Sequence, residues 1–179
     1  GIKHWEILCS RSLSTPVSYE YDKLKGMGYR ETSGIGLRVI HEGRIGLAST
    51  SNPNRMTQLT EAALASAVYG EKATFEFPAQ PTDGSVKIYD ESVPALSGER
   101  LVQRGDGIIA AIKEKVPDVQ VSVEFHPTVQ QVNLRNSAGL NGNYETTGLA
   151  VSIEGILIEG DSILSVYDSH DSCRDDAPL

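Results

Sequence analysis

The chain has 179 residues, of which 39% are hydrophobic and 22% charged, a composition typical of a globular protein with one well-buried core. Its formal net charge of −8 argues against a general binder of phosphate backbones, so we expect no nucleic-acid partner. The sequence lacks an apolar run of about 18 residues and an amino-terminal signal-peptide pattern. We therefore expect a cytoplasmic location and no membrane partner.

The first part of the chain is predicted to form strands. Ile2–Ser10 and Val17–Leu24 are β-rich runs, and the turn signal Ser14-Thr15-Pro16 separates them. Together with the hairpin that follows, they predict an antiparallel meander of four strands. The glycine pairs at 26/28 and 34/36 lack the third glycine of a dinucleotide-binding loop, so we interpret both as turn glycines.

The segment from Gly34 to Thr50 is predicted to be a β-hairpin. Two β-rich runs, 35–40 and 45–49, flank a polar tip in which Gly43 can supply the positive φ of a tight turn. The segment contains more glycines than one turn requires, namely Gly34, Gly36, Gly43 and Gly46. Glycine weakens a strand unless a bulge or another backbone lies close by, so this surplus suggests a site.

Two amphipathic helices are predicted. Met56–Tyr69 has apolar residues near a 3.6-residue period and an alanine-rich side that permits close approach to a sheet. A linker and a short strand over Val86–Tyr89 follow. The second helix covers Ser97–Val116, and Gly105-Asp106-Gly107 predicts a kink or a division into two segments there.

The second half of the chain is predicted to be mostly strand. Val119–Phe125 alternates strictly between apolar and polar residues, and Val129–Asn136 is expected to pair back as the next strand. His126 precedes a proline, which places it in extended or turn conformation at a strand end, as a surface or core-edge histidine. Residues 137–143 read as a turn-rich loop.

A long strand over Tyr144–Ile158 and a last strand over Ile163–Tyr167 complete the pattern. The apolar positions of the long strand shift phase across Gly155, which predicts a β-bulge. The whole pattern predicts an α+β fold, an antiparallel sheet built from two meanders with two main helices packed on one face. We expect one α+β domain over 1–167 and an acidic tail, or the start of a linker to a further domain, over 168–179.

Local motifs for catalysis are weak. The chain has no Gly-x-Ser-x-Gly elbow, and Cys9 and Cys173 read as two unrelated free thiols. The tail around His170 holds metal-donor types without the spacing of a zinc site, so solvated charge is the simpler interpretation. The loop Asn136–Gly139 is either a structural turn or an irregular backbone that meets an extended ligand.

Two blocks of sequence stand out when taken together. The first is Gly34-x-Gly36-Leu-Arg38, continuing through Gly43-Arg-x-Gly46-x-Ala48-Ser-Thr50 into an alanine-rich helix. The second is Asn136-Ser137-x-Gly139 with Glu145-Thr146-Thr147 downstream. In this order and separation they resemble the amino-terminal domain of the TldD/PmbA (TldE) metallopeptidase family. The similarity runs from about residue 26 to residue 167, nearly the whole chain.

The resemblance implies that the bond-breaking groups lie outside this chain. In this family, whose members are also named modulators of DNA gyrase, a carboxy-terminal domain carries zinc on a His-Glu-x-x-x-His motif and a later cysteine. Members act in peptide hydrolysis, microcin maturation and antitoxin degradation, as homodimers or TldD–TldE heterodimers. We therefore expect no catalytic residue, metal or cofactor in this chain, and no hydrolysis by this chain alone. The resemblance leaves open whether the full-length protein is the zinc-bearing peptidase or its metal-free partner subunit.

The residues that carry the resemblance are also the candidate site. We expect them to border the passage of an extended or unfolded peptide, held by strand addition, or a subunit contact. Arg38 is either buried against an acidic partner or presented to a peptide carboxylate, and packing at the edge of the core without a role in a site is an equal alternative. The alternative is a stand-alone acidic α+β module that binds or dimerises through sheet edges. The candidates are Gly34, Gly36, Arg38, Gly43, Gly46, Asn136, Ser137 and Gly139.

Overall fold

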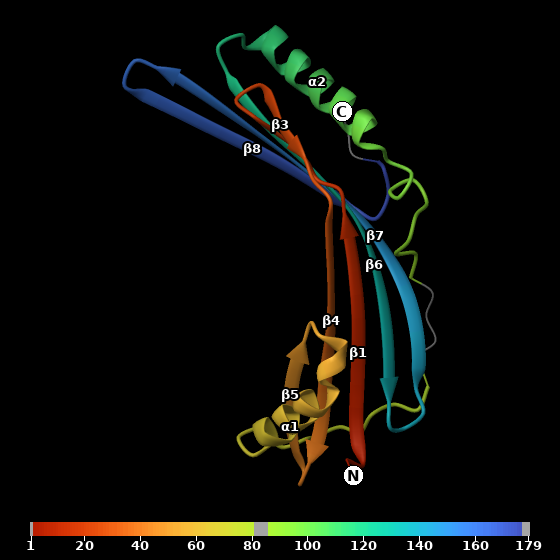
Figure 1. Cartoon of the computed structure of the whole chain (residues 1–179). Coiled ribbons are helices and arrows are strands. Elements are labelled where there is room, and N and C mark those ends of the chain that lie inside the picture. The colour runs from red at the N-terminus through yellow and green to blue at the C-terminus, as the bar shows by residue number, and fades with distance from the viewer. Residues whose placement is uncertain (1, 81–85, 177–179) are drawn as a thin grey trace. The chain divides into compact units, whose positions relative to one another are not determined.

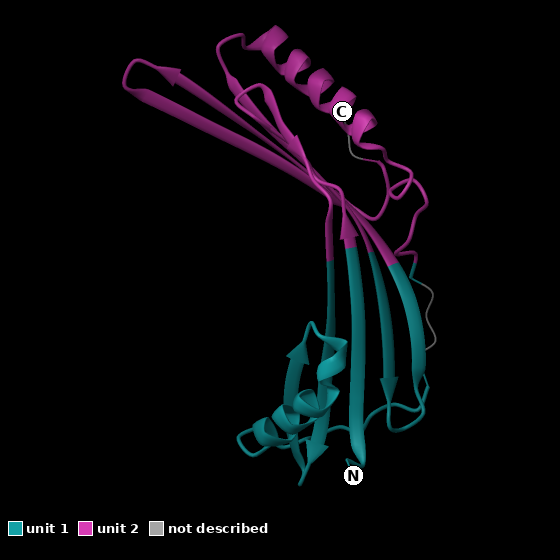
Figure 2. Ribbon diagram, in the orientation of Figure 1, with its two compact units in different colours: residues 1–12, 32–86, 130–145 teal, residues 13–31, 87–129, 146–179 magenta. Residues whose placement is uncertain are grey.

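The computed structural model describes residues 2–80 and 86–176, which form two compact units (Figures 1 and 2). Unit 1 comprises residues 1–12, 32–86 and 130–145, and unit 2 comprises residues 13–31, 87–129 and 146–179. Each unit combines antiparallel strands with one α-helix and is described separately below. The predicted α+β class is confirmed.

The strands are β1 (His4–Ser14), β2 (Val17–Glu20), β3 (Lys23–Met27), β4 (Arg30–His41), β5 (Arg44–Thr50), β6 (Gln120–Asn136), β7 (Asn141–Glu159) and β8 (Ser162–Ser172). The helices are η1 (Pro53–Arg55), α1 (Met56–Ala67) and α2 (Gly98–Lys115). The strands pair in the order β3-β2-β6-β1-β4-β5, with β7 on β6 and β8 on β7. The sequence did not predict that β6 would lie between β2 and β1, because local patterns carry no information about distant partners.

The predicted hairpin in unit 1 is confirmed. Strands β4 and β5 pair from Ile35 opposite Thr50 to His41 opposite Arg44. Glu42 and Gly43 both have positive φ, 51° and 74°, as a tight two-residue hairpin turn requires. The strand-forming residues on either side fix the register, so local chemistry was enough to predict this element.

Helix α1 packs on one face of this hairpin. The buried cluster consists of Leu37 and Val39 from β4 with Leu59, Ala63 and Ala67 from the helix. A Cβ atom at Gly46 would lie 2.0 Å from the carbonyl oxygen of Ala63, so the helix approaches as closely as the strand backbone allows. This confirms that the alanine-rich side of the helix permits close approach to the sheet.

Helix α2 in unit 2 runs without interruption from Gly98 to Lys115, so the predicted kink or division at Gly105-Asp106-Gly107 is wrong. Gly105 is needed for packing, because a Cβ atom there would lie 2.4 Å from Cε2 of the Tyr19 ring. The Tyr19 hydroxyl lies 2.8 Å from an Asp106 carboxylate oxygen. Burial and this hydrogen bond raise the pKa of Tyr19 to about 12.

Two predicted boundaries in unit 2 are also wrong. The predicted strand over 17–24 is divided by a turn at Tyr21 and Asp22, whose φ angles are 50° and 67°. The predicted break at His126 is absent, since β6 continues through it to Asn136. The carbonyl of Pro127, a residue without a backbone N–H, accepts a hydrogen bond from Thr15 N at 3.3 Å.

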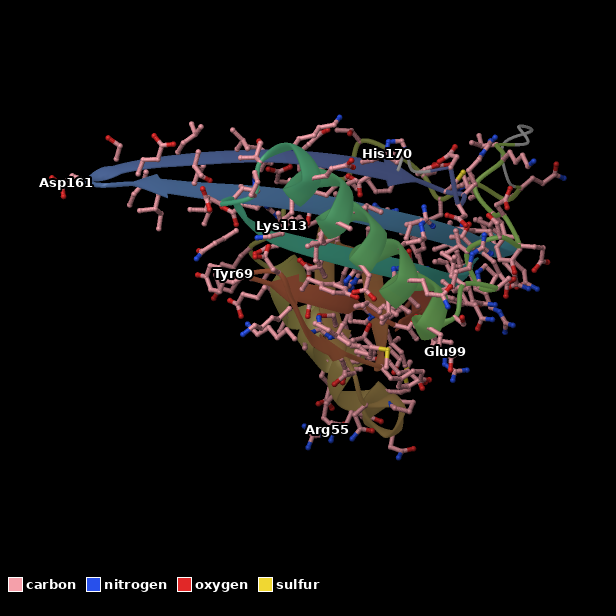
Figure 3. All side chains as sticks on the ribbon, turned by 90° about the horizontal axis from the view of Figure 1, so that it is seen from above. Arg55, Tyr69, Glu99, Lys113, Asp161 and His170 are labelled. Atoms are coloured by element: carbon pink, nitrogen blue, oxygen red, sulfur yellow. The ribbon has the colours of Figure 1, made fainter. Side chains whose placement is uncertain are left out.

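The β7–β8 hairpin corrects two further predictions. Its register is unbroken from Leu149 opposite Ser172 to Glu159 opposite Ser162, so Gly155 is not a bulge. The alternation of apolar residues along β7 changes at Gly155 because the outer part of the hairpin carries apolar residues on both faces. Strand β8 also extends five residues beyond the predicted end, to Ser172. In unit 2 the tip near Asp161 extends past the Lys113 end of α2 (Figure 3).

The segment before α2 does not form the short strand predicted over Val86–Tyr89. Its backbone is irregular there, although Thr147 N donates a hydrogen bond to the carbonyl of Ile88 at 3.0 Å. Neither α-helix in the described part of the chain combines the length and apolarity needed to cross a bilayer.

Candidate functional site

A groove lies on the face of the unit 1 hairpin opposite α1. Because side chains alternate along a strand, Leu37 and Val39 point to the helix while Gly36 and Arg38 point the other way. The groove has a volume of about 620 Å³. Its polar and apolar walls come from three strands, with lining residues Glu6, Leu8, Gly36, Arg38, Leu47 and Ser49.

Arg38 is held at one end of this groove. Its guanidinium forms an ion pair with the Glu6 carboxylate, and the exposed fractions of the two side chains are 39% and 12%. The guanidinium carbon also lies 5.1 Å from the ring centroid of Phe75 and 5.4 Å from that of Phe77, within cation–π range. The structure therefore places Arg38 against an acidic side chain of the same chain while leaving part of it exposed.

The hydrogen-bonding capacity of Arg38 is not exhausted by Glu6. Its Nε atom is buried and has no hydrogen-bond partner among the described residues. A guanidinium has five N–H donors, so Arg38 retains donors for a further acceptor at the groove. The Arg38–Glu6 ion pair has no net charge, and the Arg38 guanidinium keeps further N–H donors. This combination favours an uncharged acceptor such as a carbonyl group.

Gly36 leaves part of the groove open. A Cβ atom placed there would meet no other atom within 4 Å, so the space above this glycine is free. Leu8 and Leu47 also line the groove, with exposed fractions of 39% and 63%. The groove therefore combines open space with exposed apolar side chains.

The outer edge of β5 is partly covered. Ile45 N donates a hydrogen bond to the carbonyl of Glu71 at 2.9 Å. Leu47 N donates to the Ser66 hydroxyl at 2.8 Å, and that hydroxyl lies 2.9 Å from the carbonyl of Leu47. An added strand cannot use these backbone groups, so the groove on the face is the better place for an extended chain in unit 1.

Asn136 belongs to a structural turn between β6 and β7. Its side chain is buried, and Nδ2 donates to the carbonyl of Pro78 at 2.8 Å. Its Oδ1 accepts hydrogen bonds from Ala138 N at 2.9 Å and Leu140 N at 3.1 Å. Because these contacts occupy both ends of the amide, the side chain holds the turn.

The remaining predicted residues have separate places. Gly43 and Gly139 have φ angles of 74° and 107° in turns. Ser137 exchanges hydrogen bonds with the backbone of Trp5, at 2.8 Å through its N–H and 3.1 Å through its hydroxyl. Gly46 lies under α1, and Gly34 lies near the Ser10 hydroxyl. Of the predicted set, only Gly36 and Arg38 line the groove.

Three residues of the site were not predicted from the sequence. Glu6 lies 32 residues before Arg38, and nothing in its local sequence marks it as a partner. Phe75 and Phe77 form an edge-to-face pair with centroids 5.8 Å apart. Two of the chain's three phenylalanines in one short irregular segment were a signal that could have indicated this cluster.

A second groove in unit 1 lies beside α1. It has a volume of about 770 Å³ and is mostly apolar, with Trp5, Ile7 and Leu64 among its lining residues. None of the predicted site residues lines it.

The donor side chains present do not fit a zinc ion. Among the described residues, no three histidine, cysteine, aspartate or glutamate side chains gather closely enough to hold a metal. In the tail, His170 Nε2 lies 3.4 Å from an Asp176 oxygen, and Arg174 lies 3.8 Å from the other oxygen of the same carboxylate. Cys9 and Cys173 are both free thiols, as predicted.

Comparison with known proteins shows which family this chain resembles. Residues 5–67 match the family model for PmbA/TldA metallopeptidase domain 1. The resemblance to the TldD/PmbA family is confirmed. Every residue that lines the Gly36 groove falls within the matched range. No curated protein matches the chain.

Solved structures share the fold. TldE from Thermococcus kodakarensis has a TM-score of 0.79 at 19% identity, over 95% of this chain and 40% of that chain. A candidate modulator of DNA gyrase from Bacteroides thetaiotaomicron has a TM-score of 0.79 at 19% identity, over 98% and 42%. A candidate modulator of a DNA gyrase from Thermotoga maritima has a TM-score of 0.77 at 14% identity, over 98% of this chain and 41% of that chain. The chain thus spans about two fifths of the length of each of these proteins.

Proposed function

We propose that this chain is the substrate-binding and assembly part of a TldD/PmbA-type peptidase. The observation that carries the proposal is the Gly36 groove, whose lining lies entirely within the region that matches the first domain of this family. Bond cleavage would belong to a zinc-bearing domain elsewhere in the full-length protein, acting as a homodimer or a TldD–TldE-type heterodimer. The chain alone would bind peptides without cleaving them.

The groove suits one segment of an extended peptide. An apolar side chain would occupy the open space above Gly36, in the groove that Leu8 and Leu47 also line. A peptide carbonyl next to it would accept a hydrogen bond from a free N–H of Arg38, while Glu6 holds the guanidinium in place. Main-chain contacts and one apolar pocket would accept many sequences, as an enzyme that acts on unfolded chains requires.

Filling the groove tests this proposal. The probe is a fluorescein-labelled hexaleucine peptide with capped ends and a solubilising lysine pair, titrated into the 179-residue chain by fluorescence anisotropy. Gly36→Val places a branched side chain in the open space, and we expect peptide affinity to fall at least about tenfold. Gly26→Val is the matched control, because Gly26 is also a strand glycine with open space beside it.

Two results would contradict the proposal. One is wild-type chain that does not bind the peptide at all. The other is a folded Gly36→Val variant that binds as tightly as the wild type and the Gly26→Val control. Far-UV circular dichroism establishes folding of both variants before the titration.

A second candidate function is self-association without any peptidase activity, and the β7–β8 hairpin favours it. Ile163 and Tyr167, which lie on one face of β8, have exposed fractions of 72% and 84%, which is unusual for apolar residues on an edge strand. We propose that a second copy of the chain covers this surface. Sedimentation velocity should show a dimer that Ile163→Glu converts to monomer, whereas a wild-type chain that stays monomeric at all concentrations argues against it.

A further inference from the structure

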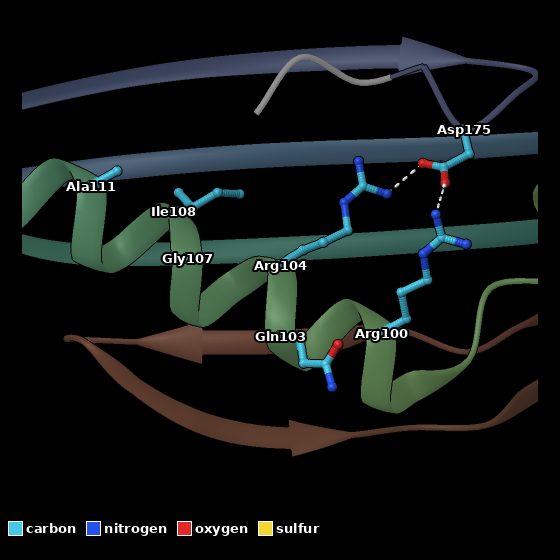
Figure 4. Close-up of a pocket in the computed structure, with 7 residues that line it drawn as sticks. All are labelled: Arg100, Gln103, Arg104, Gly107, Ile108, Ala111 and Asp175. Atoms are coloured by element: carbon cyan, nitrogen blue, oxygen red, sulfur yellow. Dashed lines mark hydrogen bonds and ion pairs between the residues drawn. The ribbon is translucent and has the colours of Figure 1, made fainter.

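Two arginines on α2 in unit 2 form a positively charged cluster (Figure 4). Arg100 and Arg104 lie four residues apart on one helix face, where like charges repel. The Asp175 carboxylate lies between them, in contact with the Arg104 guanidinium and 3.7 Å from that of Arg100. The cluster therefore already binds one carboxylate, supplied by the segment that follows β8.

The charges of this cluster do not balance. Among the ion pairs of the described residues, Asp175 is the only carboxylate on these two guanidiniums, and the other acid of that segment, Asp176, contacts His170 and Arg174. Arg104 Nε is buried without a hydrogen-bond partner in the described structure. Arg100 remains 62% exposed. The cluster keeps a net positive charge and free donors in a protein whose overall charge is −8.

A groove of about 780 Å³ adjoins the two arginines. From Arg104 it continues along the same helix over Gly107, Ile108 and Ala111. Gly107 has open space where a Cβ would be, so no side chain fills this part of the groove. The groove thus joins a cationic end to a small apolar floor.

We propose that this groove binds an amphipathic carboxylate, a ligand with one carboxylate head and a short apolar body. The head would contact Arg100 and Arg104 in the place of Asp175, and the body would lie on Ile108 and Ala111. The chemistry is that of a free aliphatic acid or of a peptide C-terminus with an apolar last residue. Asp175 is then an internal competitor that occupies the site until a ligand displaces it.

The internal competitor sets the expected affinity. A side chain tethered beside its site acts at an effective concentration in the millimolar range, so a free carboxylate must overcome it. The Asp175 backbone N–H also donates to the Ser92 hydroxyl at 2.9 Å, which keeps the carboxylate near the arginines. The site does not depend on the Gly36 groove, so either proposal can fail without the other.

Removing the competitor tests the inference. Asp175→Asn keeps the shape of the side chain and an acceptor oxygen but removes the charge. The probes are octanoate and N-acetyl-leucyl-leucine, with N-acetyl-leucyl-leucinamide as the uncharged control, titrated into the full chain and followed by amide chemical shifts. We expect Asp175→Asn to bind at least one carboxylate probe about tenfold more tightly than the wild type does, and not to bind the amide.

Further variants locate the binding. Arg104→Gln in the Asp175→Asn background should abolish binding, and Arg100→Gln, at an exposed position, should weaken it severalfold without endangering the fold. Lys115→Ala removes one positive charge from the same helix outside the groove and should change nothing. If only octanoate binds more tightly, the ligand is a free aliphatic acid. If only N-acetyl-leucyl-leucine binds more tightly, the ligand is a peptide C-terminus.

The inference is overturned if folded Asp175→Asn binds neither carboxylate probe more tightly than the wild type does. It is also overturned if Lys115→Ala weakens binding as much as Arg100→Gln does, since binding would then follow the net charge of the chain and not this site.

Discussion

Arg38 and Glu6 form an ion pair that joins β4 to β1, with the Arg38 guanidinium also within cation–π range of Phe75 and Phe77. The Glu6 side chain is only 12% exposed. A charge in such a position is costly to leave without its partner. The pair therefore both stabilises unit 1 and fixes the polar end of the Gly36 groove.

Glu6→Gln should destabilise the chain by about 1–2 kcal/mol, less than for a fully buried pair because Arg38 is partly exposed. Urea unfolding followed by circular dichroism measures this difference. The control is Glu20→Gln, which removes an exposed ion pair with Lys25 and should have a much smaller effect. Equal effects of the two substitutions would show that the Arg38 pair is an ordinary surface pair.

Gly46→Ala should destabilise the chain by about 2–3 kcal/mol, because its Cβ would lie 2.0 Å from the Ala63 carbonyl oxygen and push α1 from the sheet. Gly36→Ala is the matched control on the other face of the hairpin. Its Cβ meets open space, so we expect a change within about 0.5 kcal/mol. Thermal unfolding of both variants checks the contrast, and a Gly46→Ala variant as stable as wild type would contradict the close packing of α1.

Asn136→Ala should destabilise the chain by about 2–4 kcal/mol, since it leaves the Pro78 carbonyl and two backbone N–H groups without their partner. Peptide affinity of the folded fraction should stay unchanged, because Asn136 does not line the groove. Asn133→Ala, on the exposed part of β6, is the control and should have little effect on stability. Weaker peptide binding by folded Asn136→Ala would show that this residue contributes to the binding site.

The Asp22 carboxylate should stabilise the folded chain near neutral pH, and this contribution should be lost in acid. Burial raises the pKa of its carboxyl, but hydrogen bonds from Lys113 and from Val121 N, together with the charge of Lys113, outweigh burial and lower the pKa overall. A lowered pKa in the folded state gives stability that is present above the unfolded value of about 3.9 and is lost as pH falls through the folded pKa.

Urea unfolding of wild type and Asp22→Asn between pH 3 and 7 measures this effect. The wild type should lose more stability than the variant does below about pH 4, by less than about 1 kcal/mol because the pair is partly exposed. Asp161→Asn, which removes a carboxylate at the exposed turn between β7 and β8, is measured beside them as the charge-matched control. Parallel acid slopes for wild type and Asp22→Asn would contradict this assignment.

The sequence determined the elements whose signals are local. Gly43 and its neighbours specified the turn of the β4–β5 hairpin, and the period of apolar residues specified α1. The same stretch also carried the family resemblance. For the candidate site, Gly36 and Arg38 were both among the predicted residues, and they line the same groove because alternate positions of a strand share a face.

The tertiary structure decided what depends on distant partners. Gly105 does not break α2, since Tyr19 packs against it, and Gly155 is not a bulge, since β8 pairs without a shift. Glu6, Phe75 and Phe77 complete the Arg38 site from parts of the chain that no local pattern connects to it. The local conformation of a residue depends mainly on the residues next to it in the sequence. Its contacts depend on strand register and on packing, which arise only when the chain folds.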